Sequence, residues 1–220
     1  MVKKKLQNYL LITALYLCAF TGKATEPFIF SRISNTPTNY YSVFIMDTGE
    51  CSALDLASML EFYNPNIQKE FALKIAKTYI QECLYEGVNH DIAFCQMVLE
   101  TGFLCYGGSV QKYQNNFCGL GATSGKASGE IFPDMQTGIR AHIQHLKAYA
   151  SRNNIIKKSV DKRFRFVQRG TATTIYALTG KWASDPQYDT KIENLLIRLF
   201  THRSVMAQQS NLEIVNKFSK

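Results

Sequence analysis

One apolar stretch, from Ile92 to Leu104, constrains the fold of this chain more than any other feature. Its hydrophobic side chains fall on nearly every side of a helix, which is typical of a helix enclosed by a core. Gln96 and Glu100 interrupt the apolar surface, and their i, i+4 spacing places them on the same face. Gly102 then predicts the end of the helix. The sequence thus predicts a buried helix whose last turn carries a lone glutamate.

Glu100 is the first candidate for chemistry. In such a helix its carboxyl would be poorly hydrated, and it would lie near the negative end of the helix dipole. Both conditions penalise the anion, so we expect the pKa of Glu100 to be raised above that of a free glutamate. A carboxyl that holds its proton near neutral pH can act as a general acid. The alternative is a structural role, in which Glu100 caps the chain or pairs with an arginine.

The composition is that of a folded protein with an export signal. Of the 220 residues, 46% are hydrophobic and 19% charged, which suits one domain with a substantial core. Lysines at positions 3–5 precede an apolar run from Leu10 to Phe20, and together they predict a signal peptide at 1–24. The alternative is an uncleaved membrane anchor, although the run is short for spanning a bilayer. We expect export to the periplasm or cell envelope of a bacterium.

Cleavage after Ala24 would remove four lysines and no acid, which lowers the formal net charge from +8 to +4. A mildly basic protein without a run of Lys or Arg is not expected to bind nucleic acid. We also expect a monomer, no cofactor, and no stable membrane insertion after cleavage. His142 and His145 lie three residues apart, but no third ligand accompanies them, so we expect no metal site. Cys105 and Cys118 flank a loop and are the one pair for which a disulfide is considered.

Local signals divide the rest of the chain. We expect an N-terminal arm at 25–51 with a strand-like piece at 40–46, one domain at 52–205 and a tail at 206–220. Capping and breaking residues predict helices at 53–63, 67–86, 134–151 and 172–178, and a last one from Asp185 to about Arg203. The glycine-rich segment 105–133 predicts loops and short strands. These elements make an α+β fold that is mainly α.

Four motifs then occur in order: Glu100–Gly102, Gln114–Gly121, Gly138–His142 and Trp182–Tyr188. This set resembles the glucosaminidase domain family, bacterial enzymes that cut peptidoglycan on a lysozyme-like scaffold. The resemblance extends from about residue 57 to residue 203. It implies a lysozyme-like helical domain with a small loop/β lobe over the cleft.

The resemblance also implies an activity. We expect hydrolysis of the β-1,4 bond between N-acetylglucosamine and N-acetylmuramic acid in peptidoglycan glycan strands, with Glu100 as general acid. Family members often lack an agreed second carboxylate, which implies that the substrate's N-acetyl group assists and that Tyr188 lies near the reacting sugar. The alternatives are a lytic transglycosylase, which also relies on one glutamate, and a non-enzymatic wall-binding protein that retains the cleft.

Further site residues are weighed against plain structural roles. Glu130 is the candidate second carboxylate, or else a solvated surface residue. Asn115 and Asn116 can bind an acetamido group or shape a turn, and Trp182 can stack on a sugar or anchor the core. The residues expected to bind substrate are Gln96, Asn115, Asn116, Phe117 and Trp182.

Overall fold

The computed structural model describes residues 41–123 and 127–218, with side chains at 41–122 and 128–212. One compact unit begins at Tyr41. The predicted signal peptide and most of the predicted arm lie outside the described residues.

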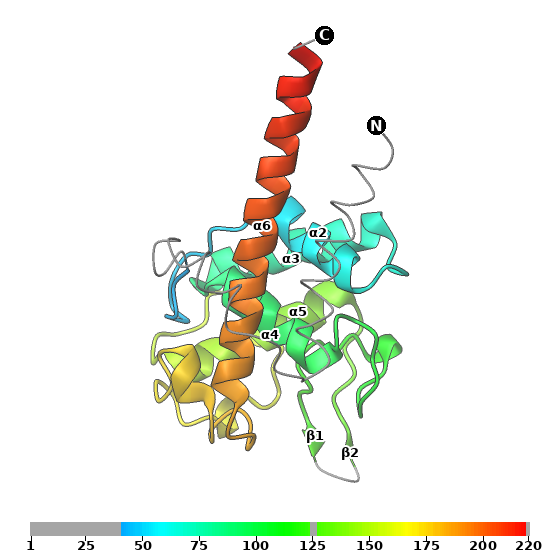
Figure 1. Ribbon diagram of the computed structural model, residues 1–220. Coiled ribbons are helices and arrows are strands. Elements are labelled where there is room, and N and C mark those ends of the chain that lie inside the picture. Colours follow the sequence, from blue (N-terminus) through cyan, green and yellow to red (C-terminus); the bar gives the residue numbers. More distant parts are fainter. Residues whose placement is uncertain (1–40, 124–126, 219–220) are drawn as a thin grey trace. The chain divides into compact units, whose positions relative to one another are not determined.

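Five α-helices make up most of this unit (Figure 1). They are α2 (Ala53–Tyr63), α3 (Lys69–Glu86), α4 (His90–Thr101), α5 (Met135–Ala150) and α6 (Tyr188–Phe218). The strands β1 (Ala122–Thr123) and β2 (Ala127–Ser128) form an antiparallel pair, and short 3-10 turns occur at Lys112–Gln114, Phe164–Phe166 and Ile175–Leu178. The prediction of a mainly α fold is confirmed. In the described residues β structure amounts to this one short hairpin, so the β lobe over the cleft stays a prediction.

The helix ends follow from local capping chemistry. Ser52 and Asp55 form a capping box at the start of α2, and the Asp134 side chain accepts the Thr137 N–H at the start of α5. Gly87 and Gly102 end α3 and α4 in the left-handed conformation, which glycine adopts without strain. The predicted helices at 53–63, 67–86 and 134–151 are therefore confirmed, with ends shifted by at most two residues.

Helix α4 lies at the centre of the core. Every residue from His90 to Val98 is buried, as the apolar pattern of the segment predicts. The helix packs against α2, α3 and α6 (Figure 1). The helix that carries Glu100 is therefore fixed on several sides, and only its last turn reaches the surface.

Two buried ion pairs hold α5 against α3. Arg140 Nε lies 2.9 Å from Glu82 Oε2, and Lys147 Nζ lies 2.8 Å from Glu86 Oε2. Removing Lys147 would leave the buried Glu86 without its cation, and loss of one partner of such a pair typically costs about 3–5 kcal/mol. These pairs set the position of the α5 face that carries His142 and His145.

The described part of the expected N-terminal arm, from Tyr41 onward, packs on the core. Ile45 is fully buried and Cys51 nearly so, both within the main core. The predicted strand at 40–46 is reduced to a bridge between Phe44 and Thr174, beside the hydrogen bond from the Ile45 N–H to the Thr173 carbonyl. Backbone pairing with a distant loop, which no local signal encodes, thus holds this segment in place.

Helix α6 continues beyond its expected end near Arg203 to Phe218. Residues 204–218 contain neither glycine nor proline, so nothing local terminates the helix. From Met206 to Leu212 it is exposed, and in Figure 1 this red portion extends past the other helices. Among the described residues no helix combines the length and the low charge needed to cross a bilayer.

Candidate active site

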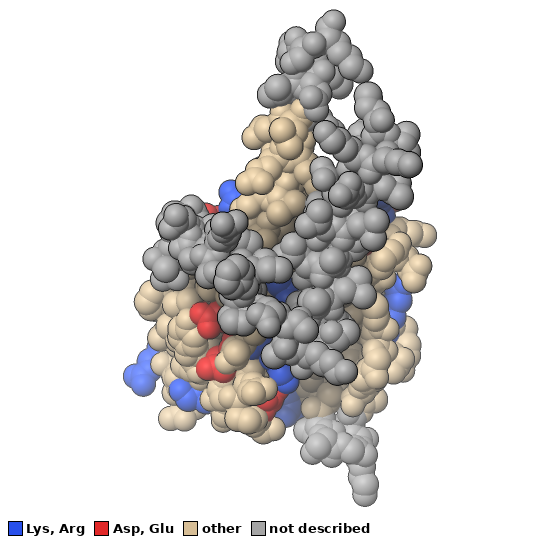
Figure 2. Space-filling model, viewed as in Figure 1, with Lys and Arg blue, Asp and Glu red and all other residues tan. Residues whose placement is uncertain are grey.

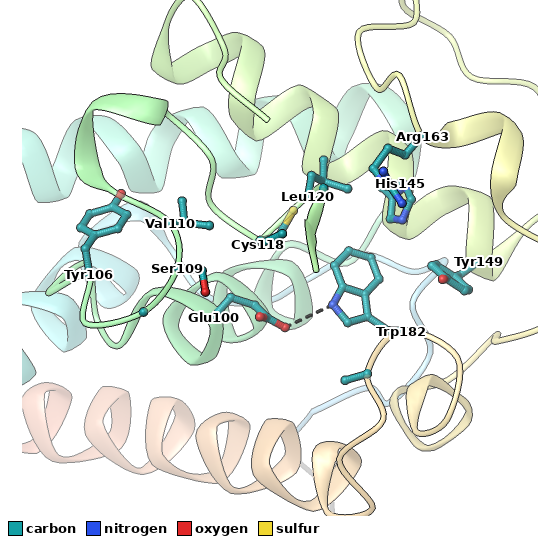
Figure 3. Close-up of a pocket in the computed structure, with 15 residues that line it drawn as sticks. Glu100, Tyr106, Ser109, Val110, Cys118, Leu120, His145, Tyr149, Arg163 and Trp182 are labelled. Carbon is teal, nitrogen blue, oxygen red and sulfur yellow. Dashed lines mark hydrogen bonds between the residues drawn. The ribbon is translucent and has the colours of Figure 1, made fainter. Parts of the chain in front are cut away.

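A cavity of about 400 Å³ opens beside the C-terminal end of α4 (Figure 3). Its size falls within the range of small-molecule sites in proteins. Walls come from the loop after α4, the segment 118–122, one face of α5 and the turn at 182–183. Glu100 is the one carboxylate among the residues that line it. The apolar helix therefore delivers a single acid to the cavity.

Two hydrogen bonds hold the Glu100 carboxyl. The Tyr188 hydroxyl donates to Oε1 at 2.6 Å. The Trp182 indole N–H donates to the same oxygen at 3.2 Å, and Figure 3 shows this second bond. No described residue forms a hydrogen bond or ion pair with Oε2. This oxygen faces Gly119, where an added Cβ would lie 3.8 Å away. The proton of a neutral Glu100 is thus favoured on Oε2, the oxygen not already accepting two donors.

Burial raises the pKa of Glu100, and the hydrogen bonds from Tyr188 and Trp182 offset only part of that rise. The side chain still reaches solvent through the open mouth of the cavity, but protein atoms surround the carboxyl closely. No lysine or arginine in the described residues forms a salt bridge with it. The direction of the shift is the one expected from the sequence, and it suits a proton donor.

A buried chain of hydrogen bonds stands behind Tyr188. The Gln96 amide donates to the Tyr188 oxygen at 2.9 Å, and the Gln96 carbonyl lies 2.9 Å from Nε2 of His142. The Tyr79 hydroxyl lies 3.0 Å from Nδ1 of the same imidazole. Gln96, His142 and Tyr79 are fully buried. The chain therefore links three helices to the candidate acid.

The direction of these hydrogen bonds follows from the acceptor at their end. Burial, with a smaller effect from His145, lowers the pKa of His142 to about 3, so its ring is neutral and carries one N–H. Facing the Gln96 carbonyl, Nε2 must donate, and Nδ1 therefore accepts from Tyr79. With its oxygen accepting from Gln96, Tyr188 directs its own proton to Glu100. Gln96, expected to bind substrate, is thus placed behind the cavity as a support for Tyr188.

The chain turns sharply after Glu100. Gly102, Phe103 and Leu104 have positive φ values of 56°, 55° and 62°. Phe103 and Leu104 are not residues that adopt this conformation readily, so surrounding contacts must enforce it. The Thr101 hydroxyl accepts the Leu104 N–H at 3.0 Å, and the Asn64 amide donates to the Phe103 carbonyl at 2.9 Å. This turn carries the chain from the acid to Tyr106 on the cavity wall.

Asn116 fixes the shape of the loop that leads into the cavity-wall segment 118–122. Its amide donates to the carbonyls of Leu120 and Glu130 at 2.8 and 3.1 Å, and its oxygen accepts the Leu120 N–H at 3.0 Å. With no exposed surface, its side chain is committed to the backbone. Phe117 is 2% exposed and packs in the core, while Asn115 donates to a backbone carbonyl. Asn115, Asn116 and Phe117, three of the five residues expected to bind substrate, thus have scaffold contacts.

Glu130 and Gly138 complete this region. Glu130 does not line the cavity, and its Oε2 lies 3.0 Å from Nζ of Lys162 in an exposed ion pair. Gly138, within α5, touches the loop so closely that an added Cβ would lie 1.7 Å from the Asn115 carbonyl oxygen. Only glycine allows α5 and this loop to approach so far.

Trp182 has both of the roles considered for it. Its ring contacts those of His145 and Tyr149 at centroid distances of 5.2 and 5.6 Å, and it packs against the core. It also lines the cavity and bonds Glu100. A half-buried indole held in this way can present apolar surface to a sugar without reorienting.

Comparison with known proteins identifies the family. The family model described as glucosaminidase, mannosyl-glycoprotein endo-beta-N-acetylglucosaminidase, matches residues 76–200. The chain belongs to the glucosaminidase family. A protein of Borreliella burgdorferi described as uncharacterized is 48% identical over 164 residues, which span 74% of this chain and 80% of that protein. Family membership implies a glycoside hydrolase, and the matched region contains Glu100, Trp182 and Tyr188.

Sequence reasoning missed part of the lining of this glucosaminidase-family cavity. His145 and Tyr149 line it from one face of α5, and their i, i+4 spacing was the available signal. Arg163 lines it from an irregular segment that offers no periodicity. All five described cysteines are free thiols, so Cys105 and Cys118 do not form the disulfide considered.

Proposed function

We propose that this protein is an exported endo-β-N-acetylglucosaminidase that hydrolyses the β-1,4 bond between N-acetylglucosamine and N-acetylmuramic acid in peptidoglycan. The observation that carries the proposal is the state of Glu100. It is the single acid of the cavity, its pKa is raised, and both of its hydrogen-bond donors use one oxygen. Family membership supplies the reaction class.

Glu100 acts as the general acid. Its free oxygen, Oε2, delivers the proton to the glycosidic oxygen of the leaving sugar, while Tyr188 and Trp182 hold Oε1 and stabilise the carboxylate that remains. After departure of the leaving group the same carboxylate can accept a proton from water. General acid catalysis of this kind contributes about 10²–10⁴ in rate.

The positive charge at the anomeric carbon needs a second group. In this proposal the carbonyl oxygen of the substrate's own N-acetyl group attacks the anomeric carbon as the glycosidic bond breaks, and water then opens the cyclic intermediate. Tyr188, expected to lie near the reacting sugar, is 4% exposed, and Gln96 and Glu100 engage its hydroxyl, so its part in this proposal is to hold the acid. Glu130 remains the candidate if a protein carboxylate is required, although its contact with Lys162 favours a structural role.

Export completes the proposal. The lysines and apolar run of residues 1–24, which lie outside the described residues, would direct the chain to the envelope, where the polymer is found. Charged side chains of both signs are interspersed on the uncovered part of the face in Figure 2.

The test is a digest of purified peptidoglycan by the wild type and by Glu100→Gln, with the products separated and weighed. We expect new reducing ends on N-acetylglucosamine from the wild type and none from the variant. Products with anhydro ends on N-acetylmuramic acid would instead identify a lytic transglycosylase. Equal digestion by a folded Glu100→Gln protein would remove Glu100 from the reaction, and binding without cleavage by the wild type would indicate a wall-binding protein.

A further inference from the structure

The cavity carries a second charged group that the proposed chemistry does not use. Arg163 lines the same cavity as Glu100, and in Figure 3 it lies with His145 on the far side of Trp182 from the acid. The aromatic walls at this end are Trp182 and Tyr149. One cavity thus has an acid on one side of an indole ring and a guanidinium on the other.

Arg163 has no carboxylate partner among the described residues. Asp161, the nearest acid in sequence, is 4% exposed, and its Oδ2 lies 2.7 Å from Nδ1 of His145. The other oxygen of Asp161 accepts the backbone N–H of Arg163 at 2.8 Å. Asp161 therefore fixes the main chain of Arg163, while the guanidinium lies 5.8 Å from the centre of the Phe166 ring and has no ion pair with a described carboxylate.

The segment around Arg163 is strongly basic. Residues 152–169 contain seven lysines or arginines and one acid. Lys157 and Lys162 pair with Glu82 and Glu130, so the basic residues nearest to acids are neutralised. Burial raises the pKa of Tyr149, and the charge of Arg163 opposes that rise, which places the guanidinium near the cavity wall. Arg163 is half-buried there, where a charge is screened less than on the open surface.

An unpaired guanidinium in a cavity suits one kind of ligand group. Arginine presents N–H donors in a planar fork that matches a carboxylate, and such contacts are stronger than those between neutral groups. We propose that Arg163 forms a carboxylate subsite of this cavity, which binds an acidic group of the glycan's substituents while Glu100 acts on the sugar bond. The inference rests on the proposed function, because it assigns a role to a second part of the same substrate.

Peptidoglycan offers this chemistry from two sources. Its N-acetylmuramic acid residues carry peptides with free carboxylates, and removal of the peptide exposes the carboxylate of the lactyl ether itself. Uncharged N-acetylglucosamine oligosaccharides have neither. The three ligands therefore separate a peptide carboxylate, a lactyl carboxylate and the sugar alone.

The experiment uses calorimetry to measure the affinity of these ligands for the Glu100→Gln protein, which would not consume them. The same measurement is made on a double variant that also carries Arg163→Gln. Arg165→Gln is the matched control, because Arg165 is an exposed arginine of the same segment that does not line the cavity. We expect Arg163→Gln to weaken binding of peptide-bearing fragments about tenfold. Binding of uncharged oligosaccharides should be unchanged, and Arg165→Gln should change neither.

The outcomes are distinct. Weakening with peptide-bearing fragments alone supports the subsite with the peptide as its source, and weakening with amidase-treated fragments alone assigns it to the lactyl group. Weakening with both of these, but not with uncharged oligosaccharides, supports a subsite that accepts either carboxylate. Equal weakening with all three ligands, or no weakening with any, overturns the subsite. If wild-type protein cleaves no peptidoglycan, the proposed function fails, while these binding comparisons still decide whether Arg163 recognises a carboxylate. A melting temperature close to that of the parent shows that the variant is folded.

Discussion

Glu100 and Glu130 border the same loop region, but they have opposite surroundings. Glu100 ends a buried helix and receives hydrogen bonds from two neutral donors, Tyr188 and Trp182. Glu130 follows a two-residue strand and faces the ammonium group of Lys162 at 3.0 Å. Burial around neutral donors allows the Glu100 carboxyl to hold a proton, whereas Glu130 is held in an exposed ion pair.

The supports of the two regions differ in the same way. Behind Glu100, the chain from Tyr79 through His142 and Gln96 to Tyr188 consists of side chains on helices. Around Glu130, the hydrogen bonds of Asn116 go to loop backbone. Side chains on packed helices can hold a reacting group within the tolerance that catalysis needs. The comparison therefore assigns the proton transfer to the Glu100 region and the shape of the cavity to the loop.

The largest effect should come from Glu100→Gln. The exchange is nearly isosteric but removes the transferable proton, so kcat on peptidoglycan should fall by about 10²–10⁴. The melting temperature should remain close to that of the wild type, because glutamine can still accept the hydrogen bonds at this position. A folded variant with normal kcat would show that Glu100 does not transfer the proton, and the proposed chemical difference between the two regions would be wrong.

The origin of Glu100's environment was readable in the sequence only in part. The apolar pattern of α4 and the stop at Gly102 are local, so they predict a carboxyl at a buried helix end. Its partners Trp182 and Tyr188 lie 82 and 88 residues away, and no periodicity specifies which atoms of distant helices meet. The resemblance to a family named both residues, but their bonds to a single oxygen required the fold.

The loop region shows a second limit of prediction from the sequence. Asn115 and Asn116 were expected to bind sugar, because asparagine side chains suit acetamido groups and turns equally well. The outcome depends on which backbone atoms lie within reach, and in this fold those of Leu120 and Glu130 lie close to Asn116. Arg163 lies in a segment without helical or strand periodicity, so its place on the cavity wall had no sequence signal.

The next effect tests the loop. Gly138→Ala would place a methyl group 1.7 Å from the Asn115 carbonyl oxygen, so α5 and the loop must separate. Overpacking of this kind costs about 1–3 kcal/mol and sometimes more. We expect a lower melting temperature and weaker substrate binding, because the wall that includes Gly119 moves.

Gly102→Ala is the matched control. An added Cβ there meets nothing within 4 Å, and only the positive φ of 56° opposes it. Strain of this kind costs about 1–2 kcal/mol per residue. Circular dichroism melts of both variants should therefore show the greater loss for Gly138→Ala. A Gly138→Ala protein as stable as the wild type would mean that the close contact with the loop does not constrain α5.

Tyr188→Phe should have an intermediate effect with a defined direction in pH. The Tyr188 hydrogen bond lowers the pKa of Glu100, so its loss should raise that pKa further. A general acid is active while protonated, and its rate falls as pH rises through its pKa. The alkaline limb of the kcat profile should therefore move to higher pH, with kcat lowered about tenfold at the optimum.

The same measurement on Gln96→Leu tests the buried chain. Gln96 does not touch Glu100 but supplies the donor to the Tyr188 oxygen. If the chain orients Tyr188, this variant should shift the alkaline limb in the same direction by a smaller amount. A limb that moves to lower pH in either variant would show that Tyr188 is not a donor to the acid.

The smallest effect is expected for Glu130→Gln. The substitution removes an ion pair with Lys162, whose side chain is 72% exposed, and pairs of this kind contribute about 0–1 kcal/mol. Glu130 still supplies its backbone N–H to the Leu120 carbonyl, so the loop should keep its shape. We expect kcat and the melting temperature to stay close to those of the wild type. Lys162→Gln should behave in the same way, because it removes the other half of the pair.

If Glu130→Gln instead lowers kcat by more than about a hundredfold without unfolding the protein, and Lys162→Gln does not, then Glu130 takes part in the reaction as its second carboxylate. The loop would in that case have to bring Glu130 to the substrate, and the chemistry would be shared between the two regions.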